Sequence, residues 1–393
     1  MLANDVLALT DGLDGALSEL RRDIHQHPEL GLDLPRTQGV VTQALSGLGL
    51  DISLGETSTS VTADLPGPEG APTILLRADM DALPMTEETD ESFRSVHEGR
   101  AHSCGHDAHV AMLLAAAEVL SAMRSELPVS VRFMFQPGEE GFGGAEHMID
   151  EGVLEGVDRA FALHVTPSIP SGMVTSRGGS FMASADELDI VIHGRGGHAS
   201  SPHQATDPIP AACSVVTAIQ TMVTRDVNAL EPGVVTIAQI HAGTTHNVIP
   251  PTASLGGTIR STSANSRLLL HQGIERVTHG VTAAHGCTCD VNITEGYPVT
   301  VNNDAEAERA IELASEVLGA DKAFELPYPV MGAEDFSYVL EGVPGAMAFL
   351  GMCPPDIANS LEAPSNHSNK MRIDESAMTS GVAMHLAQVL VAG

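Results

Sequence analysis

TILLRAD, residues 73–79, is a short apolar run that ends in a carboxylate, which is typical of a buried strand. Downstream, AHVAMLLAAAEVLSAM (108–123) has the length and residue types of a helix. VSVRFMF (129–135) and DRAFALHV (158–165) are again short apolar runs that predict strands. Because strands and helices alternate, these residues predict βα units in an α/β domain with a mostly parallel sheet.

Polar side chains suited to chemistry follow each of the three predicted strands. Asp79-Met80-Asp81 ends the first strand, QPGEE (136–140) follows the second, and His164 lies at the end of the third. Ligands of open α/β sheets bind beyond the carboxyl ends of the strands. We therefore expect these side chains to meet at one site.

The pattern changes near residue 183 to that of a second domain. Two helices are predicted near 205–225 and 263–285, and the strands around them are DELDIVIHGRGG, VVTIAQIHAG, TASLGGTIRS and CTCDVNITEGYP. Strand, helix, two strands, helix and strand is the order of a ferredoxin-like α+β unit. We predict an inserted domain at 184–296 that interrupts one α/β domain, formed by 1–183 and 297–393.

Composition restricts the partners of this chain of 393 residues. Its formal net charge is −32 and it has two lysines, which disfavours binding to nucleic acid or to an anionic membrane. No run of about eighteen apolar residues predicts a membrane span, and the N-terminus lacks the basic region of a signal peptide. Five cysteines without framework spacing favour a reducing compartment, so we expect a cytoplasmic protein.

HSCGHDAHV (102–110) contains the first candidate donors. Cys104 and His106 are two residues apart, and an extended loop can direct both side chains at one point. The helix predicted to follow favours a thiolate at its N-terminus. Three interpretations remain open on this stretch alone: a metal site, a Cys–His nucleophilic pair, and a buried cysteine beside surface histidines.

The adjacent acids Glu139 and Glu140 follow the second predicted strand. Adjacent side chains diverge there, so one carboxylate can bind a metal while its neighbour acts as a base. In isolation, most such pairs are solvated surface residues. His164 and His367 are single histidines, which in isolation are more often structural than ligating.

Together these residues supply thiolate, imidazole and carboxylate donors, which suit Zn²⁺, Mn²⁺ or Co²⁺. Five donors are more than one tetrahedral ion needs, and two ions that share a bridging ligand would use them all. The five candidates are Cys104, His106, Glu140, His164 and His367.

Several longer motifs resemble the amidohydrolase branch of the M20 family of metallopeptidases. That branch includes N-acyl-amino-acid amidohydrolases, hippurate hydrolases and indole-acetyl-amino-acid hydrolases. The similar stretches run in order from about residue 20 to 375 and are RRDIHQHPELG, LLRADMDALPM, HSCGHDAHVAMLLAAA, FQPGEEGFGGAEHMIDEG, ALHV, GRGGHASSPHQATDPI, HNVIPPTASLGGTIR and MGAEDFSYV.

The resemblance implies that the five candidates hold two divalent ions per subunit, with Cys104 as the bridge. Zn²⁺ or Mn²⁺ is expected, and Co²⁺ and Ni²⁺ are the other options. Glu139 is implied to be the general base and acid. The broader family has an H-x-D motif where this chain has Asp79-Met80-Asp81. We therefore expect Asp79 and Asp81 to support the ligands from behind rather than bind metal.

The resemblance also implies that the inserted domain is a lid that pairs with a second subunit, so we expect a homodimer or a higher homo-oligomer. His198 is implied to be catalytic, reaching the partner's active site to hold the scissile carbonyl. Asn247 and Arg260 are expected to contact the carbonyl and carboxylate of the substrate, because a guanidinium binds a carboxylate with two hydrogen bonds.

The function expected from the resemblance is hydrolysis of the amide bond of N-acyl-L-amino acids, with water activated by the metals and Glu139 as base. The first alternative is a dipeptidase or carboxypeptidase that uses the same two-metal centre. A hydrolase that depends on Cys104 without metal, and a binding protein that retains the fold, are the others.

Overall fold

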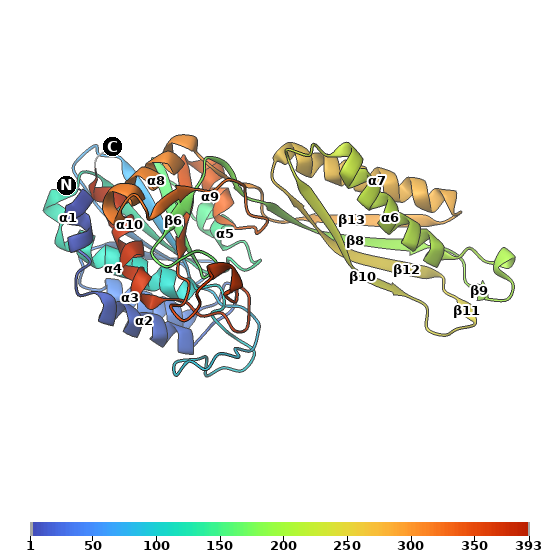
Figure 1. Cartoon of the computed structure of the whole chain (residues 1–393), viewed down its shortest axis with the longest axis horizontal. Coiled ribbons are helices and arrows are strands. Elements are labelled where there is room, and N and C mark those ends of the chain that lie inside the picture. The colour runs from blue at the N-terminus through green and yellow to red at the C-terminus, as the bar shows by residue number, and fades with distance from the viewer. Residues whose placement is uncertain (1–2, 392–393) are drawn as a thin grey trace. The chain divides into compact units, whose positions relative to one another are not determined.

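The computed structural model describes residues 3–391. Residues 1–2, at the start of the predicted segment 1–183, and residues 392–393, at the end of the predicted segment 297–393, lie outside the described residues. The chain forms two compact units (Figure 1). The first comprises the chain up to Gly179, Val301–Tyr328 and the residues from Asp335 onward, and the second comprises Ser180–Thr300 with Pro329–Glu334.

The first unit is built on an eight-stranded sheet in the order β1-β2-β4-β3-β5-β16-β6-β15. The strands are β1 (Asp51–Leu54), β2 (Val61–Leu65), β3 (Thr73–Asp79), β4 (Ser130–Gln136), β5 (Arg159–Thr166), β6 (Val174–Ser176), β15 (Ala323–Glu325) and β16 (Gly345–Gly351). The three strands predicted near 73, 129 and 158 correspond to β3, β4 and β5. They lie side by side and parallel, with β16 next to β5.

The prediction of a mostly parallel sheet is wrong, because this sheet is mixed. β1 and β2 pair antiparallel, β2 pairs antiparallel with β4, and β6 pairs antiparallel with β16. Short connections explain two of these pairings. The short segment 55–60 joins β1 to β2, and the short segment 167–173 brings the chain back from β5 to β6, whereas parallel neighbours need a long crossover.

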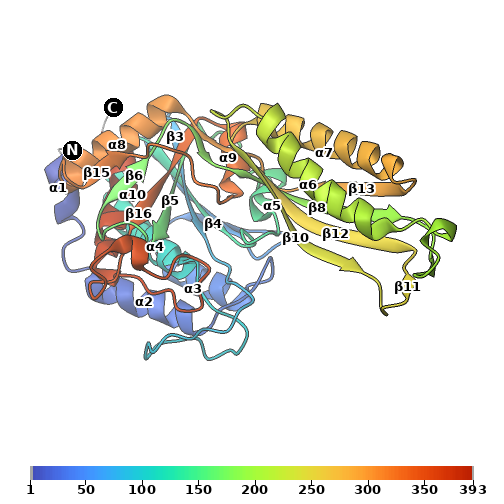
Figure 2. The same cartoon turned by 45° about the vertical axis from the view of Figure 1, so that its right-hand side comes forward.

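Helices pack around this sheet (Figure 2). They are α1 (Ala3–Ala8), α2 (Asp14–Gln26), α3 (Pro35–Leu45), α4 (His106–Ala122), α5 (Gly144–Asp150), α8 (Asp304–Leu318), α9 (Phe336–Gly342) and α10 (Met378–Leu390). The helix predicted at 108–123 is α4, and its first residue is His106. Most of its residues are buried because it packs against α2, α3, α10 and β3, which explains why it is apolar on nearly every face.

The second unit has a four-stranded antiparallel sheet in the order β10-β12-β8-β13. Its strands are β8 (Ser184–His193), β10 (Gly233–Ala242), β12 (Thr252–Ser261) and β13 (Thr288–Glu295), and its helices are α6 (Pro208–Asp226) and α7 (Ala264–Ala284). One apolar core joins the sheet to both helices. The role of this unit as a lid or as a dimerisation domain stays a prediction.

Two short ribbons complete the described strands. β9 (Gly197–His198) pairs with β11 (Val248–Ile249), and β7 (Gly179–Met182) pairs with β14 (Thr300–Asn302). Among residues 3–391, no helix is both long and apolar enough to cross a membrane.

Candidate metal centre

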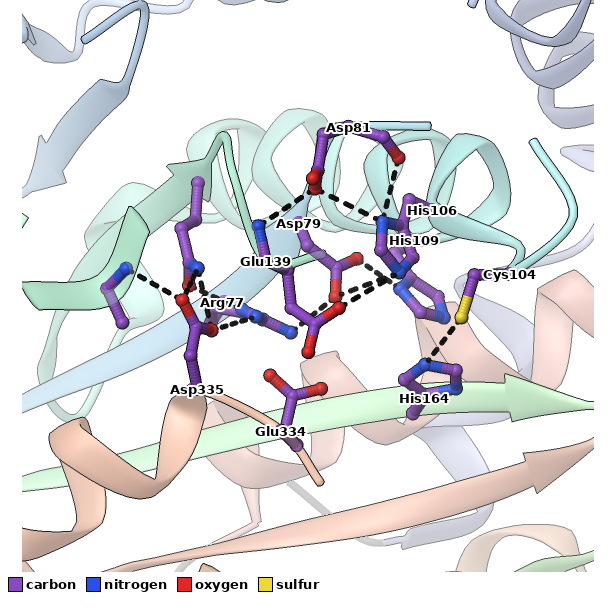
Figure 3. A network of polar contacts seen from close by, with 12 residues as sticks. Arg77, Asp79, Asp81, Cys104, His106, His109, Glu139, His164, Glu334 and Asp335 are labelled. Atoms are coloured by element: carbon purple, nitrogen blue, oxygen red, sulfur yellow. Dashed lines mark hydrogen bonds and ion pairs between the residues drawn. The ribbon is translucent and has the colours of Figure 1, made fainter. Parts of the chain in front are cut away.

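Cys104, His106 and His164 lie with the carboxylate of Glu139 near the carboxyl ends of the parallel strands of the first unit (Figure 3). β3 ends at Asp79, β4 ends at Gln136 just before the glutamate pair, and His164 lies near the end of β5. Cys104 and His106 enter the same place from the N-terminus of α4, and the Sγ of Cys104 lies 3.4 Å from the Nε2 of His164.

Gly105 makes this approach possible. Its φ is +95°, a conformation that glycine adopts without steric cost. A Cβ at this position would lie 2.3 Å from the Cγ2 of Val165 on β5. The residue between Cys104 and His106 must therefore be glycine for both side chains to face β5.

His106 has its ring orientation set by the protein. Its Nδ1 donates a hydrogen bond of 2.8 Å to the carbonyl oxygen of Asp81, so Nε2 is the nitrogen that can bind a metal once its proton is lost. Nε2 is buried, has no hydrogen-bond partner within the described residues, and lies 3.5 Å from Oδ2 of Asp79. Burial opposes charge on this ring, but Asp79 and Cys104 raise the pKa of His106 well above its usual value. The site therefore favours a positive charge.

Asp81 holds the glutamate pair in place. Its Oδ1 accepts the backbone N–H of Glu139 and its Oδ2 accepts that of Glu140, each at 3.0 Å. The Oε2 of Glu139 lies 3.9 Å from Nε2 of His106, and the Oε1 of Glu140 lies 4.0 Å from the same atom. Both carboxylates thus face the unpaired nitrogen.

His367 reaches the site from a distant loop. Its φ of +67° lies in the left-handed region, and its backbone N–H donates to the carbonyl oxygen of Ser103 at 2.7 Å. Its Nε2 lies 3.2 Å from the Oε1 of Glu140. Hydrogen bonds to Cys104 and Glu140 raise the pKa of His367 to about 10.

These donors form two groups that have Cys104 in common. One group is Cys104, His106 and His164, and the other is Cys104, Glu140 and His367; within each, the ligand atoms lie within 4.8 Å of one another. Thiolate, imidazole and carboxylate suit divalent ions such as Zn²⁺, and the buried Nε2 of His106 has no hydrogen-bond partner among the described residues. The residues present therefore fit a centre of two divalent ions.

His109, which the sequence left without a role, is fully occupied by protein partners. Its Nδ1 donates to Oδ1 of Asp79, and its Nε2 accepts the backbone N–H of Val165 at 2.8 Å. Neither nitrogen has a lone pair available for a metal. His109 instead braces Asp79, whose pKa is held well below its usual range by Arg77 and the neighbouring histidines despite complete burial.

The sequence interpretation missed the network behind Asp79. Arg77 is 1% exposed and donates to Asp79, to Oε1 of Gln136 at 2.9 Å and to Oδ1 of Asp335 at 3.1 Å. Gln136 also donates to both oxygens of Asp335. A signal was available, because Arg77 is a lone charge inside an apolar strand, and a buried charge needs partners.

The remaining predicted residues lie in the second unit. His198 is on β9 opposite Val248 of β11, and the backbone N–H of Ala199 donates to the carbonyl oxygen of Asn247 at 3.0 Å. This ribbon therefore brings His198 and Asn247 together. Arg260 lies near the far end of β12 from this ribbon and does not join them.

The site combines thiolate, imidazole and carboxylate donors with a further glutamate beside them. This combination is typical of metal-dependent hydrolases. Residues 75–390 match the model of peptidase family M20/M25/M40. The chain belongs to this family and is a hydrolase, so the resemblance inferred from the motifs is confirmed.

Similar proteins include amidohydrolases and a peptidase. The chain is 38% identical to Thermostable carboxypeptidase 1 of Saccharolobus solfataricus (98% of this chain, 96% of the relative). It is 38% identical to IAA-amino acid hydrolase ILR1-like 2 of Arabidopsis thaliana (95% and 84%) and 36% identical to N-acetylcysteine deacetylase of Bacillus subtilis (92% and 93%).

A solved structure shares the fold of the whole chain. The Bacillus subtilis YXEP protein, a dinuclear metal binding peptidase from the M20 family, matches with a TM-score of 0.81 at 30% identity, covering 97% of this chain and 99% of that one. This similarity and the donor groups support divalent metals in this chain.

Proposed function

We propose that this protein hydrolyses the amide bond of N-acyl-L-amino acids at a centre of two divalent ions, Zn²⁺ or Mn²⁺. The observation that carries the proposal is the pair of donor groups with Cys104 in common, next to which lies the Glu139 carboxylate. The proposed ligands are Cys104, His106, Glu140, His164 and His367. The names of the plant hydrolase and the Bacillus deacetylase support an N-acyl-amino-acid substrate.

When bound, divalent ions polarise an acyl carbonyl and lower the pKa of water. The protein supplies the proton transfers. Glu139 is buried, and its backbone is fixed by Asp81, so its carboxylate is held at one place beside the proposed ligands. Glu139 takes a proton from the attacking water and returns it to the departing amino-acid nitrogen.

The second unit supplies the other proposed contacts. The Nδ1 of His198 lies 3.1 Å from the backbone N–H of Ser200 and accepts it, which places the ring hydrogen on Nε2. His198 is exposed, and that hydrogen can be donated to an acyl oxygen in a partner subunit. We propose that Asn247 and Arg260 contact the substrate carbonyl and carboxylate, and that this unit serves as the lid and dimer contact.

A second candidate function is cleavage of a C-terminal peptide bond at the same centre. The similarity to a thermostable carboxypeptidase favours it, since that relative covers nearly the whole chain. The two reactions use the same residues and differ only in the group on the acyl side of the bond.

The test combines one substitution with a substrate panel. In Glu139→Gln we expect bound metal to be unchanged while kcat falls by about 10²–10⁴-fold. Glu146→Gln, on the exposed side of α5, is the matched control. Full activity of Glu139→Gln would refute the assignment of the base. N-acetyl, N-benzoyl and indole-acetyl amino acids are compared by kcat/KM with dipeptides, and a preference for dipeptides would favour the second candidate.

A further inference from the structure

Helix α2 makes a buried contact with the start of α4 that the proposed function does not use. Arg21 and His25 lie one turn apart on α2, and both reach Oδ2 of Asp107. The Arg21 Nε lies 2.9 Å and the His25 Nδ1 lies 2.8 Å from this oxygen. All three side chains are at least 95% buried. Both donors come from the motif RRDIHQHPELG.

Asp107 is close enough in sequence to the proposed ligands His106 and Cys104 to affect their positions. It is the second residue of α4 and directly follows His106, while Cys104 lies three residues before it. The N-cap of this helix is Gly105, which has no side chain to accept a hydrogen bond from the first turn. Asp107 points toward α2, so the first turn of α4 is held from outside by Arg21 and His25.

The contact belongs to a larger network of charges. Arg21 also donates to Glu375 at 2.9 Å, Arg22 binds the same carboxylate, and His25 lies 3.3 Å from Glu87. Removing one member of a buried ionic network leaves its partner's charge uncompensated, which is strongly unfavourable. Asp107 is therefore held in one position while its partners are intact.

We infer that Arg21 and His25 are positioning residues for the metal centre and act through Asp107. The His106 ring is fixed on one side by the carbonyl oxygen of Asp81, and its backbone is fixed by the neighbouring Asp107. Without the second restraint the first turn of α4 can shift, and Nε2 of His106 and Sγ of Cys104 move relative to His164. This inference rests on the proposed roles of Cys104 and His106 as ligands.

The test measures the metal centre itself. Metal-free protein is titrated with Co²⁺, and the absorption of cobalt–thiolate and cobalt d–d transitions is recorded together with the Co²⁺ affinity. We expect Arg21→Gln and His25→Ala to weaken Co²⁺ affinity by about tenfold and to alter the d–d bands. The matched control is Arg22→Gln, because Arg22 also binds Glu375 but does not reach Asp107.

A conservative variant separates positioning from general stability. In His25→Asn the amide nitrogen can replace Nδ1 as donor to Asp107, so we expect Co²⁺ affinity to recover relative to His25→Ala. Circular dichroism verifies that each variant is folded. If folded Arg21→Gln binds Co²⁺ as Arg22→Gln does, with the same spectrum, the inference is wrong.

Two further outcomes are also decisive. If Arg21→Gln does not fold, His25→Ala and His25→Asn are compared instead. Equal Co²⁺ affinity of these two variants overturns the inference. If the unsubstituted protein binds Co²⁺ without a thiolate band, the proposed centre at Cys104 itself is wrong, and the inference falls with it. The spectrum of the unsubstituted protein thus separates the two failures.

Discussion

The Oδ1 of Asp81 accepts the backbone N–H of Glu139 at 3.0 Å, and this hydrogen bond positions the proposed general base after β4. The second oxygen of the same carboxylate accepts the N–H of Glu140. One buried side chain therefore fixes the backbone of both the proposed base and a proposed ligand. The backbone carbonyl oxygen of Asp81 in addition accepts a hydrogen bond from His106 and orients its ring.

Replacing Asp81 with Asn should damage catalysis more than folding. An asparagine side chain has one acceptor oxygen, so its NH₂ group must face one of the two backbone N–H donors. A buried donor without a partner costs about 1–3 kcal/mol. We expect kcat to fall by about 10–100-fold in steady-state assays. Asp150→Asn, exposed on α5, should match the unsubstituted protein. An unchanged kcat in Asp81→Asn would show that the backbone at Glu139 and Glu140 keeps its position without the second acceptor oxygen.

Gly105→Ala should destabilise the first unit. The new Cβ meets Val165 at 2.3 Å, and alanine at φ +95° is strained besides. We expect a loss of about 2–5 kcal/mol in the free energy of unfolding, measured by urea titration with circular dichroism. Gly12→Ala is the control, because Gly12 has φ +82° but no atom within 4 Å of its Cβ position, so only the backbone cost of about 1–2 kcal/mol remains.

A second substitution tests the cause of that loss. Val165→Ala removes the atom that the new Cβ meets, so Gly105→Ala should cost less stability in the Val165→Ala background than in the unsubstituted protein, while the backbone part of the cost stays. If Gly105→Ala costs the same in both backgrounds, contact with Val165 is not the source of the strain.

Metal removal should abolish turnover. The dinuclear relative and the donor groups both predict that phenanthroline or EDTA inactivates the enzyme and that Zn²⁺, Mn²⁺ or Co²⁺ restores it. Iodoacetamide should have little effect on the untreated enzyme, because Cys104 is buried, and burial raises the pKa of its thiol. Activity that survives chelation but is lost to iodoacetamide would instead support a thiol-dependent hydrolase.

Stability at acid pH should depend on Glu87. Burial alone would raise the pKa of this carboxyl, but hydrogen bonds and the charge of His25, together with the Ser95 N–H and the Thr89 hydroxyl, lower it to about 2. Because the folded-state pKa lies below the ordinary value of 4.5, the stabilisation is fully present above about pH 4.5 and is lost as the pH falls toward 2.

Glu87→Gln should therefore lower the free energy of unfolding by about 1–3 kcal/mol at pH 7, and the difference from the unsubstituted protein should shrink below pH 4.5. Urea titrations at several pH values measure this. The neighbouring exposed Glu88 offers the control Glu88→Gln, which should show no such pH dependence. A difference that stays constant from pH 7 to pH 3 would contradict the role given to ionised Glu87.

Local sequence was sufficient for the central strands, for α4 and for the family. The apolar runs near 73, 129 and 158 form β3, β4 and β5, and the long motifs around Cys104 and Glu139 are specific enough to identify the M20 family. Similar motifs carry Cys104, His106, Glu140 and His164, and the parallel order of β3, β4 and β5 brings together the residues that follow these strands. His367 reaches the site from a distant loop.

The tertiary structure was needed wherever partners distant in sequence set the outcome. The mixed sheet depends on how β2 pairs with β4 across a long stretch of chain, and no local pattern specifies that direction. His106 and His109 have similar local surroundings on one helix. The Asp81 carbonyl binds Nδ1 of His106 and leaves its Nε2 available, whereas the Val165 N–H occupies Nε2 of His109. The sequence does not reveal this difference, because these hydrogen bonds form only after folding.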